Sequence, residues 1–228
     1  MIINDTITGI AAIVIAYLLG SIPAAYIVTR LITGKDIRKV GGGNVGARNV
    51  FREVGKAAGI GVGIFDMAKG VAAVFIALRL LGAPTVTLVD APQTYQIFIL
   101  AAGLAAVVGH IWPVYIKFNG GNGLATSIGV LSIVMTWELL LALALVVLLV
   151  VFTRNPVLSL NISLLSVPVT ASLLGKPWIF VVFAIVLLLI LIINFIPTAR
   201  AALVKAGGGE NLFADLFRRK RASKKKRR

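Results

Sequence analysis

Long apolar stretches separated by short polar breaks dominate the chain. An apolar run of about 17–25 residues is long enough to cross the hydrocarbon core of a bilayer as a helix. We expect seven such spans, the fourth of them short: Ile7–Ile32, Ala57–Leu81, Tyr95–Ile116, Gly123–Met135, Trp137–Phe152, Val157–Leu174 and Pro177–Ile196. The apolar–polar alternation of membrane strands is absent, so the predicted fold is an all-α, polytopic helical bundle.

Composition supports lipid as the main solvent of this chain. Of the 228 residues, 59% are hydrophobic and the mean hydropathy is +0.99. A soluble domain of this size cannot hide so much apolar surface, because its own surface-to-volume ratio leaves too little interior. Cysteine is absent, which excludes disulfides and thiol chemistry.

The formal net charge of +15 is unevenly placed along the chain. Nine of the 23 Lys and Arg residues lie in Arg218–Arg228. In a membrane protein such a run is typical of a cytoplasmic segment that contacts anionic lipid, whereas a nucleic-acid-binding tail is the minor alternative. We therefore divide the chain into a membrane domain, 1–200, and a basic cytoplasmic tail without fixed structure, 201–228, and expect no nucleic-acid partner.

The charges also orient the bundle. Seven spans place the two ends of the chain on opposite sides of the membrane. With the tail inside, the inner loops and the tail together hold 19 of the 23 basic residues. This agrees with the positive-inside rule, so the N-terminus is predicted outside and the C-terminus in the cytoplasm.

The inner loop between the first two spans contains the first candidate site. Three consecutive glycines, Gly41–Gly43, permit unusual backbone angles and a close approach of backbone N–H groups to a ligand. Basic residues surround them, and Arg48 and Arg52 would share one face of a helix. Guanidinium groups and backbone N–H groups suit a phosphate or carboxylate. A basic loop with glycine turns and no ligand is the alternative.

A second candidate site spans Gly109–Gly129. His110 is the only histidine, near the inner end of the third span. A lone histidine is usually structural, but a polar residue inside a membrane bundle is a functional candidate, and neutral imidazole can act as a base. No second histidine or carboxylate cluster accompanies it, so we expect no metal site. The following glycines, Gly120, Gly121 and Gly123, lead into a helix and are a second possible anion cradle.

Two charged residues lie inside the second span. Asp66 and Lys69 are three residues apart and therefore share a helix face. Each costs about 2.5–3.5 kcal/mol at mid-membrane on insertion scales, and pairing lowers that cost. We expect a structural ion pair, and the alternatives are a direct substrate contact and a role in fixing the geometry of the neighbouring loop.

These stretches together resemble a known family, the bacterial acyl-phosphate-dependent glycerol-3-phosphate acyltransferases of the PlsY type. The resemblance covers roughly Ala16 to Asn194. It rests on four motifs in the same order: "GSIPAAY" at Gly20–Tyr26, "DIRKVGGGNVGARNVFREVG" at Asp36–Gly55, "DMAKG" at Asp66–Gly70, and "GHIWPVYIKFNGGNGLAT" at Gly109–Thr126.

The resemblance implies a reaction and a place for it. Members of the family transfer an acyl group from acyl-phosphate to the 1-hydroxyl of glycerol 3-phosphate. The product, lysophosphatidic acid, begins phospholipid synthesis at the inner face of the bacterial cell membrane. No cofactor and no metal are expected, and catalysis would rest on positioning and charge stabilisation.

The resemblance also implies roles for individual residues. The expected catalytic residues are His110, Asn44 and Arg52. The expected substrate-binding residues are Arg38, Gly42, Gly43, Asn49, Lys117, Gly120, Gly121 and Asn122.

The chain departs from the usual family pattern at several of these positions. Gly42 stands where the family usually has a serine credited with a catalytic role. Asn119 and Asn122 stand where it usually has lysines, and the polar motif that usually ends the last span is not in register in "NFIPTARAAL". The alternative function is therefore that of a catalytically impaired relative that binds a phosphorylated lipid precursor or a partner.

Overall fold

The computed structural model describes residues 2–83, 88–154 and 156–205, and it confirms the predicted all-helical bundle. The α-helices are α1 (Ile2–Gly20), α2 (Ala24–Thr33), α3 (Ala47–Glu53), α4 (Lys56–Leu80), α5 (Gln93–Ile111), α6 (Leu124–Val134), α7 (Thr136–Thr153), α8 (Pro156–Leu164), α9 (Ser166–Leu173) and α10 (Trp178–Lys205). Three short 3₁₀ turns lie between them: η1 (Ile37–Lys39), η2 (Leu88–Asp90) and η3 (Val114–Ile116). The predicted tail, apart from its first residues in α10, lies outside the described residues.

Five helical segments in the described part of the chain have the length and apolar composition to cross a bilayer. They are Asn4–Thr33, Lys56–Leu80, Gln93–Ile116, Thr136–Thr153 and Trp178–Pro197. The apolar helix α6 has 11 residues, which at 1.5 Å per residue extend only about 16 Å. The segment Leu158–Leu173 is also shorter than the other five. Each predicted span thus has a helical counterpart, while the count of seven crossings stays a prediction.

Three predicted spans are interrupted, and proline explains the interruptions. The first breaks between α1 and α2 at Pro23, the third ends as an α-helix at Ile111 just before Pro113, and the sixth divides at Leu165. Proline lacks a backbone N–H, and its ring clashes with the carbonyl four residues earlier. Pro168 therefore opposes a helix that continues through Leu164, and α8 and α9 form instead of one straight span.

Close packing of helices organises the part of the bundle formed by α1–α6. A Cβ atom added at Gly70 of α4 would meet the Thr126 backbone carbonyl of α6, and one added at Gly129 of α6 would meet the Met67 carbonyl of α4. Small residues let membrane helices approach to backbone contact, which favours van der Waals packing where lipid gives no hydrophobic driving force. The α4–α6 seam therefore depends on these two glycines.

We expect Gly129→Leu to lower the thermal stability of the purified protein sharply. The side chain would overlap the α4 backbone, and overpacking of this kind costs about 1–3 kcal/mol or more. Gly61→Leu is the matched control, because nothing in the described part of the chain lies within 4 Å of a Cβ atom added at Gly61 of α4. Equal melting temperatures of the two variants in the same detergent would contradict this packing.

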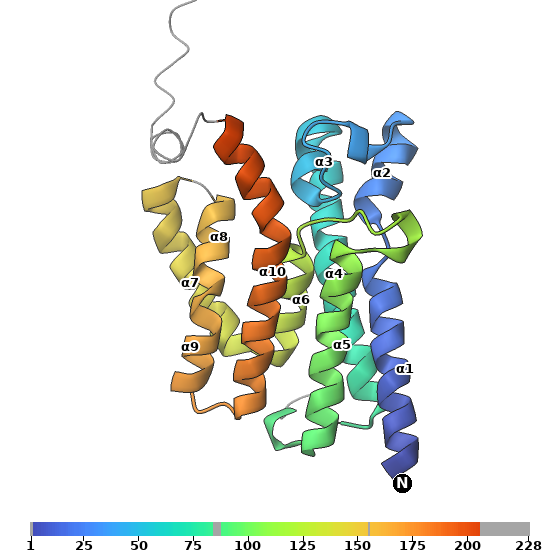
Figure 1. The fold of residues 1–228 in the computed structure, drawn as a ribbon, viewed down its shortest axis with the longest axis vertical. Helices are drawn as coiled ribbons and strands as arrows, with labels where there is room; N and C mark the ends of the chain where they lie inside the picture. The colour runs from blue at the N-terminus through green and yellow to red at the C-terminus, as the bar shows by residue number, and fades with distance from the viewer. Residues whose placement is uncertain (1, 84–87, 155, 206–228) are drawn as a thin grey trace, which may run out of the picture.

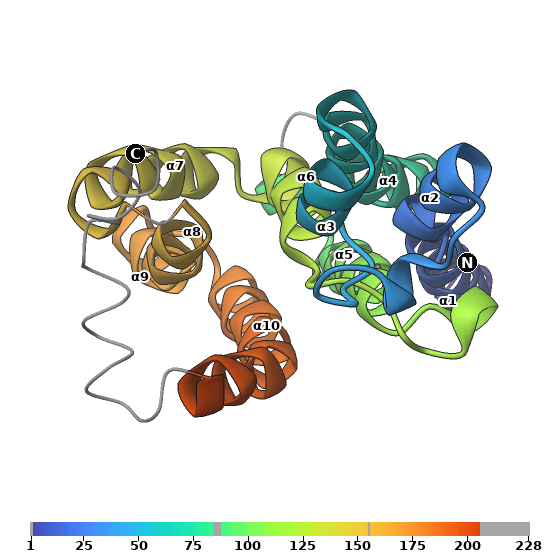
Figure 2. The ribbon, with the colours of Figure 1, turned by 90° about the horizontal axis from the view of Figure 1, so that it is seen from above.

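Helices α7–α9 lie to one side of α1–α6, and α10 lies between the two groups (Figure 1, Figure 2). Helix α10 contacts both α5 and α9, so it joins them. The segments 33–56 and 111–124 lie at one end of the bundle, where α7 and α10 also end, and α1 begins at the opposite end (Figure 1). The loops that the charge pattern assigned to one side of the membrane are thus found at the same end.

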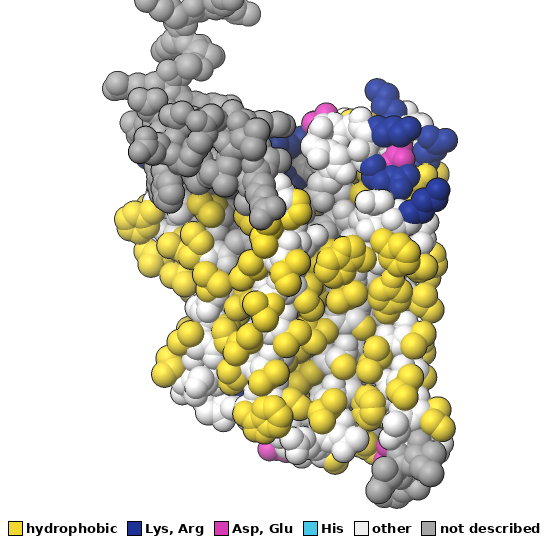
Figure 3. Space-filling model, in the orientation of Figure 1, with side chains coloured by type: hydrophobic (Ala, Val, Ile, Leu, Met, Phe, Trp, Pro, Cys, Tyr) yellow, Lys and Arg dark blue, Asp and Glu magenta, His cyan; other side chains and the backbone are white. Residues whose placement is uncertain are grey.

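The surface is divided into a broad apolar region and a charged end, as in a membrane protein. Hydrophobic side chains cover most of the visible face, and Lys and Arg side chains gather at the end formed by α2 and α3 (Figure 3). Large apolar side chains such as Leu31, Val147 and Leu173 are more than two-thirds exposed in the isolated chain. Such side chains are expected where a bilayer rather than water surrounds the helices.

Candidate active site

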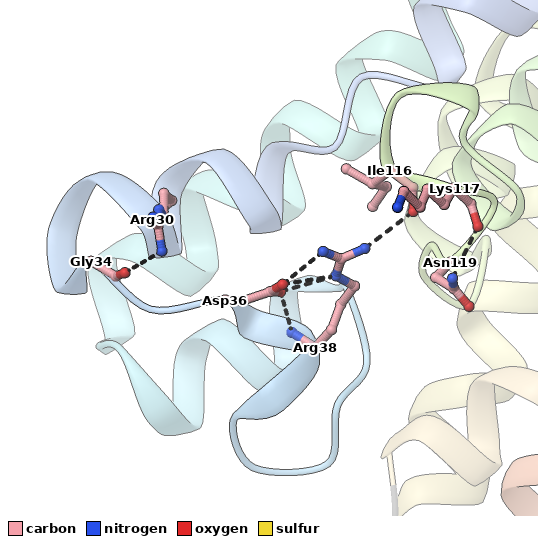
Figure 4. Close-up of polar contacts among 7 residues, drawn as sticks. All are labelled: Arg30, Gly34, Asp36, Arg38, Ile116, Lys117 and Asn119. Carbon is pink, nitrogen blue, oxygen red and sulfur yellow. Dashed lines mark hydrogen bonds and ion pairs between the residues drawn. The ribbon is translucent and has the colours of Figure 1, made fainter.

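Arg38 links the first loop, residues 34–46 between α2 and α3, to the second loop, residues 112–123 between α5 and α6. Its guanidinium donates from Nε and Nη2 to the Asp36 carboxylate, with a shortest distance of 2.7 Å, and from Nη1 to the Ile116 carbonyl at 3.2 Å (Figure 4). The side-chain hydrogen bond from Arg38 lowers the pKa of Asp36 to about 2. The carboxylate therefore stays ionised at any pH near neutrality, and the Arg38–Asp36 pair persists there.

Asn49 of α3 holds the glycine-rich loop in shape. Its amide nitrogen donates to the carbonyls of Val40 and Asn44 at 3.0 and 3.1 Å, and its amide oxygen accepts from the Gly42 N–H at 3.2 Å. The side chain is buried. The amide thus closes the loop on itself, and the predicted contact of Asn49 with a substrate stays a prediction.

The second glycine loop folds back on the end of α5. The Gly120 and Gly121 N–H groups donate to the carbonyls of Ile111 and His110, both at 3.1 Å. The Gly121 carbonyl in turn accepts from the Asn194 side chain of α10 at 3.2 Å. We expected these glycines to present free N–H groups to an anion, but the structure uses both N–H groups to satisfy carbonyls at a helix terminus.

The two loops and α10 enclose a cleft of about 600 Å³. Its described lining residues are Arg38, Gly42, Gly43, Asn44, Ile111, Trp112, Phe118, Asn119, Gly120, Gly121, Asn122, Asn194 and Pro197. Among them Arg38 is the one charged side chain, and four asparagine amides supply neutral donors and acceptors. A volume of this size is ordinary for a small-molecule site.

Seven of the predicted site residues line this cleft together. They are Arg38, Gly42, Gly43, Asn44, Gly120, Gly121 and Asn122. Arg52 on α3 and Lys117 are exposed but do not line it, and Asn49 lies behind the loop. The roles predicted for these residues stay predictions, and the structure brings only the first group together.

Asn194, Asn119 and Pro197 also line the cleft, although the sequence did not single them out as site residues. The signal for Asn194 was present: it is a polar side chain near the end of a long apolar run, and such residues tend to face a cavity or a neighbouring helix. Phe118 lines the cleft with a left-handed backbone, φ 59°, directly after Lys117 at φ 58°.

His110, predicted as catalytic, lies beneath the cleft rather than in its wall. Only 5% of its side chain is exposed, and its Nδ1 lies 3.4 Å from Asp66 Oδ1. That contact falls short of a hydrogen bond, and Nδ1 has no other partner within the described residues. Asp66 Oδ1 also lies 2.9 Å from Lys69 Nζ, so the predicted pair forms and His110 joins it.

No three His, Asp or Glu side chains converge closely enough to hold a metal ion in the ranges that the structure describes. The chemistry available in the cleft is therefore that of one guanidinium, several amides and the nearby N-terminus of α6. These groups are suited to hold and orient an anionic, hydroxyl-bearing molecule.

The fold and the cleft define a polytopic membrane protein with a polar site at the basic end of its helical bundle. Comparison with known proteins gives the family. Residues 10–203 match the family model described as glycerol-3-phosphate acyltransferase, and the chain belongs to that family.

Individual relatives agree with this assignment. Glycerol-3-phosphate acyltransferase 1 of Dehalococcoides mccartyi is 38% identical over 213 residues, which cover 91% of this chain and 97% of the relative. Glycerol-3-phosphate acyltransferase of Endomicrobium trichonymphae is 41% identical over 180 residues, covering 79% and 84%.

Solved structures share the fold. The crystal structure of PlsY, an integral membrane glycerol 3-phosphate acyltransferase, in its glycerol 3-phosphate form superposes with a TM-score of 0.74 at 30% identity, covering 86% of this chain and 92% of that one. Its lysophosphatidic acid form gives a TM-score of 0.72 at 28% identity with the same coverage. The glycerol 3-phosphate form and the lysophosphatidic acid form of this relative thus share this bundle.

Proposed function

We propose that this protein transfers an acyl group from acyl-phosphate to the 1-hydroxyl of glycerol 3-phosphate and makes lysophosphatidic acid for phospholipid synthesis. The observation that carries the proposal is the cleft, in which two separate glycine motifs and Arg38 come together in a chain of this family. The glycerol 3-phosphate and lysophosphatidic acid forms of the related PlsY support the same substrate and product.

Arg38 is the anchor for the phosphate of the acceptor. Within the described residues its hydrogen bonds use three of five N–H groups, which leaves two for a ligand. Charge-assisted hydrogen bonds to phosphate are about twice as strong as neutral ones. The side-chain amides of Asn44, Asn119 and Asn122 then orient the glycerol hydroxyls and the donor.

The reaction needs little chemistry from the protein. The 1-hydroxyl oxygen attacks the acyl carbonyl carbon, a C–O ester bond forms, and the C–O bond to the phosphate breaks. The hydroxyl proton leaves with the departing phosphate, which is itself a base near neutral pH. Holding two anions in line in a confined cleft therefore supplies most of the rate enhancement.

The protein acts at the membrane, and we place the cleft on its cytoplasmic face because the loops around it and the tail hold most of the basic residues. Within the basic tail, the run Arg218–Arg228 adds attraction for anionic lipid of about 1 kcal/mol per basic residue near the surface. This placement suits a site that receives a charged, water-soluble acceptor from the cytoplasm and returns a lipid.

The alternative is a relative that binds but does not turn over. Calorimetry with glycerol 3-phosphate and a phosphate-release assay with acyl-phosphate, on the same detergent-purified sample, separate the two functions. Binding with turnover supports the enzyme. Retained binding without turnover would favour the binding protein, and the absence of both would exclude this cleft as a glycerol 3-phosphate site.

Arg52→Ala tests the basic side chain that lies outside the cleft wall. We expect the dissociation constant for glycerol 3-phosphate to rise, and to rise more at low ionic strength, because an exposed positive charge on α3 attracts the dianion. Calorimetry at two salt concentrations measures it. Binding equal to that of the unmodified protein at both concentrations would remove Arg52 from the site.

A further inference from the structure

The proposed reaction leaves a cluster of three buried ionisable groups without a task. Asp66, Lys69 and His110 lie together under the cleft with 2–5% of their side chains exposed. Ionisable residues inside a membrane bundle are costly and usually serve a function. Their contacts lead in two directions, one toward each loop of the cleft.

Lys69 fixes the start of the segment that leads to the first loop. Its Nζ donates to the Ile22 carbonyl at 3.1 Å. Ile22 lies in the break between α1 and α2, and α2 runs directly into the loop that contains Arg38 and the three glycines. An ammonium held by Asp66 on one side and by this carbonyl on the other ties α4 to the break.

His110 supports the second loop with both its backbone and its ring. Its carbonyl accepts the Gly121 N–H at 3.1 Å. Any side chain at position 121 would collide with His110 Nε2 and would come within 2.6 Å of the Val45 carbonyl. Gly121 is therefore packed between the imidazole and the first loop.

The three side chains also share a small cavity of about 10 Å³ with both loops. Its lining includes Asp66, Lys69 and His110, together with Val45 of the first loop and Gly120 of the second. The network therefore lies directly beneath the junction of the two loops that form the cleft.

We propose that Asp66, Lys69 and His110 form a positioning network that sets the separation of the two cleft loops, and that none of the three contacts the substrates. The kinetic test of this proposal rests on the proposed function, whereas its structural test does not. The network acts on the second loop through Gly121, and on the first loop through Ile22 and the helix α2 that follows it. Its loss therefore changes the shape of the cleft before it changes the chemistry.

A double-substitution cycle tests the ion pair. Removing one partner of a buried pair leaves an uncompensated charge, whereas removing both is often tolerated. We expect Asp66→Asn and Lys69→Met each to raise KM for glycerol 3-phosphate about 10-fold or more and to lower kcat. Asp66→Asn/Lys69→Met should stay as impaired as Lys69→Met, because it still lacks the bond to the Ile22 carbonyl. A return of KM in the double variant to within about 3-fold of the unmodified value would show that the single variants act through an unpaired charge alone, and would contradict the network.

His110→Asn tests the assignment of the histidine, because its amide can stand beside Asp66 where Nδ1 was. A positioning residue gives a change in KM and leaves the shape of the pH–rate profile unaltered. A general base would contribute about 10²–10⁴-fold and one limb of that profile. Loss of such a limb in His110→Asn would overturn the proposal and restore His110 as catalytic.

A structural readout keeps the test independent of turnover. Hydrogen exchange of the backbone over residues 117–123 should speed up in Asp66→Asn and in Lys69→Met and stay fast in the double variant. Inactivity of the unmodified protein would refute the proposed function alone. Unchanged loop exchange in both single variants would refute the network.

The pair of Glu138 and Lys176 provides the matched control. Glu138 of α7 is fully buried, and its Oε1 lies 4.0 Å from Lys176 Nζ. Both α7 and α10 begin at the end of the bundle opposite the cleft (Figure 1). Glu138→Gln should leave KM and exchange over residues 117–123 unchanged, and an equal effect there would show that any buried charge loss disturbs the loops.

Discussion

Arg38→Ala is expected to reduce kcat/KM for glycerol 3-phosphate by about 100-fold or more. The substitution removes the one charged side chain among the described residues that line the cleft. Each hydrogen bond from a charged donor contributes about 1.5–3 kcal/mol, and two N–H groups of Arg38 remain for a ligand. The loss also exposes the Asp36 carboxylate, which would then repel the phosphate.

Two further variants define the role of Arg38. Arg38→Lys should recover only part of the activity. The planar guanidinium can hold Asp36 and a phosphate at the same time, whereas the lysine ammonium is a compact point charge. Arg30→Ala is the matched control at the same end of the bundle, since Arg30 donates to the Gly34 carbonyl at 2.6 Å and does not line the cleft (Figure 4). Similar losses in Arg30→Ala and Arg38→Ala would show a general effect of charge.

Gly42→Ser is expected to raise kcat by about 10-fold or more. The resemblance places a serine at this position, and one well-placed donor to a developing oxyanion contributes about 10²–10³-fold in other enzymes. Gly42 lines the cleft, and its φ is not in the left-handed region. No atom of the described residues lies within 4 Å of a Cβ atom built on it. The serine hydroxyl would thus enter the cleft without strain.

Neighbouring substitutions separate the hydroxyl from the added bulk. Gly42→Ala should leave kcat near the unmodified value, because it adds a Cβ without a donor. Gly41→Ser should lower activity, since Gly41 has φ 59° and a Cβ there would lie 2.5 Å from Asn49 Oδ1. An equal response to Gly42→Ser and Gly42→Ala would show that the hydroxyl does not act in this cleft.

The sequence predicted the bundle well because its signal is strong and local. Apolar runs indicate directly which segments form helices in lipid. Basic residues indicate which loops lie on the same side of the membrane, so the pattern alone predicted that these loops share one end of the bundle. The breaks at Pro23, Ile111 and Leu165 were missed, because hydropathy is insensitive to a helix that stops while its side chains stay apolar.

The site was predicted less completely, for reasons of geometry. Both glycine motifs reached the cleft, but the pattern could not show that the Gly120 and Gly121 N–H groups would be taken by carbonyls of α5. Nor could it show that His110 faces Asp66 rather than the cleft. Asn194 comes from a helix distant in sequence, so only the folded structure brings it to the second loop.

The most direct test of the central claim is the product itself. The protein is reconstituted in lipid nanodiscs and supplied with acyl-phosphate and isotopically labelled glycerol 3-phosphate, and the lipid fraction is examined by mass spectrometry. We predict labelled 1-acyl lysophosphatidic acid in an amount equal to the phosphate released. Phosphate release without labelled lipid, or neither product while glycerol 3-phosphate still binds, would contradict the assignment of acyl transfer to this cleft.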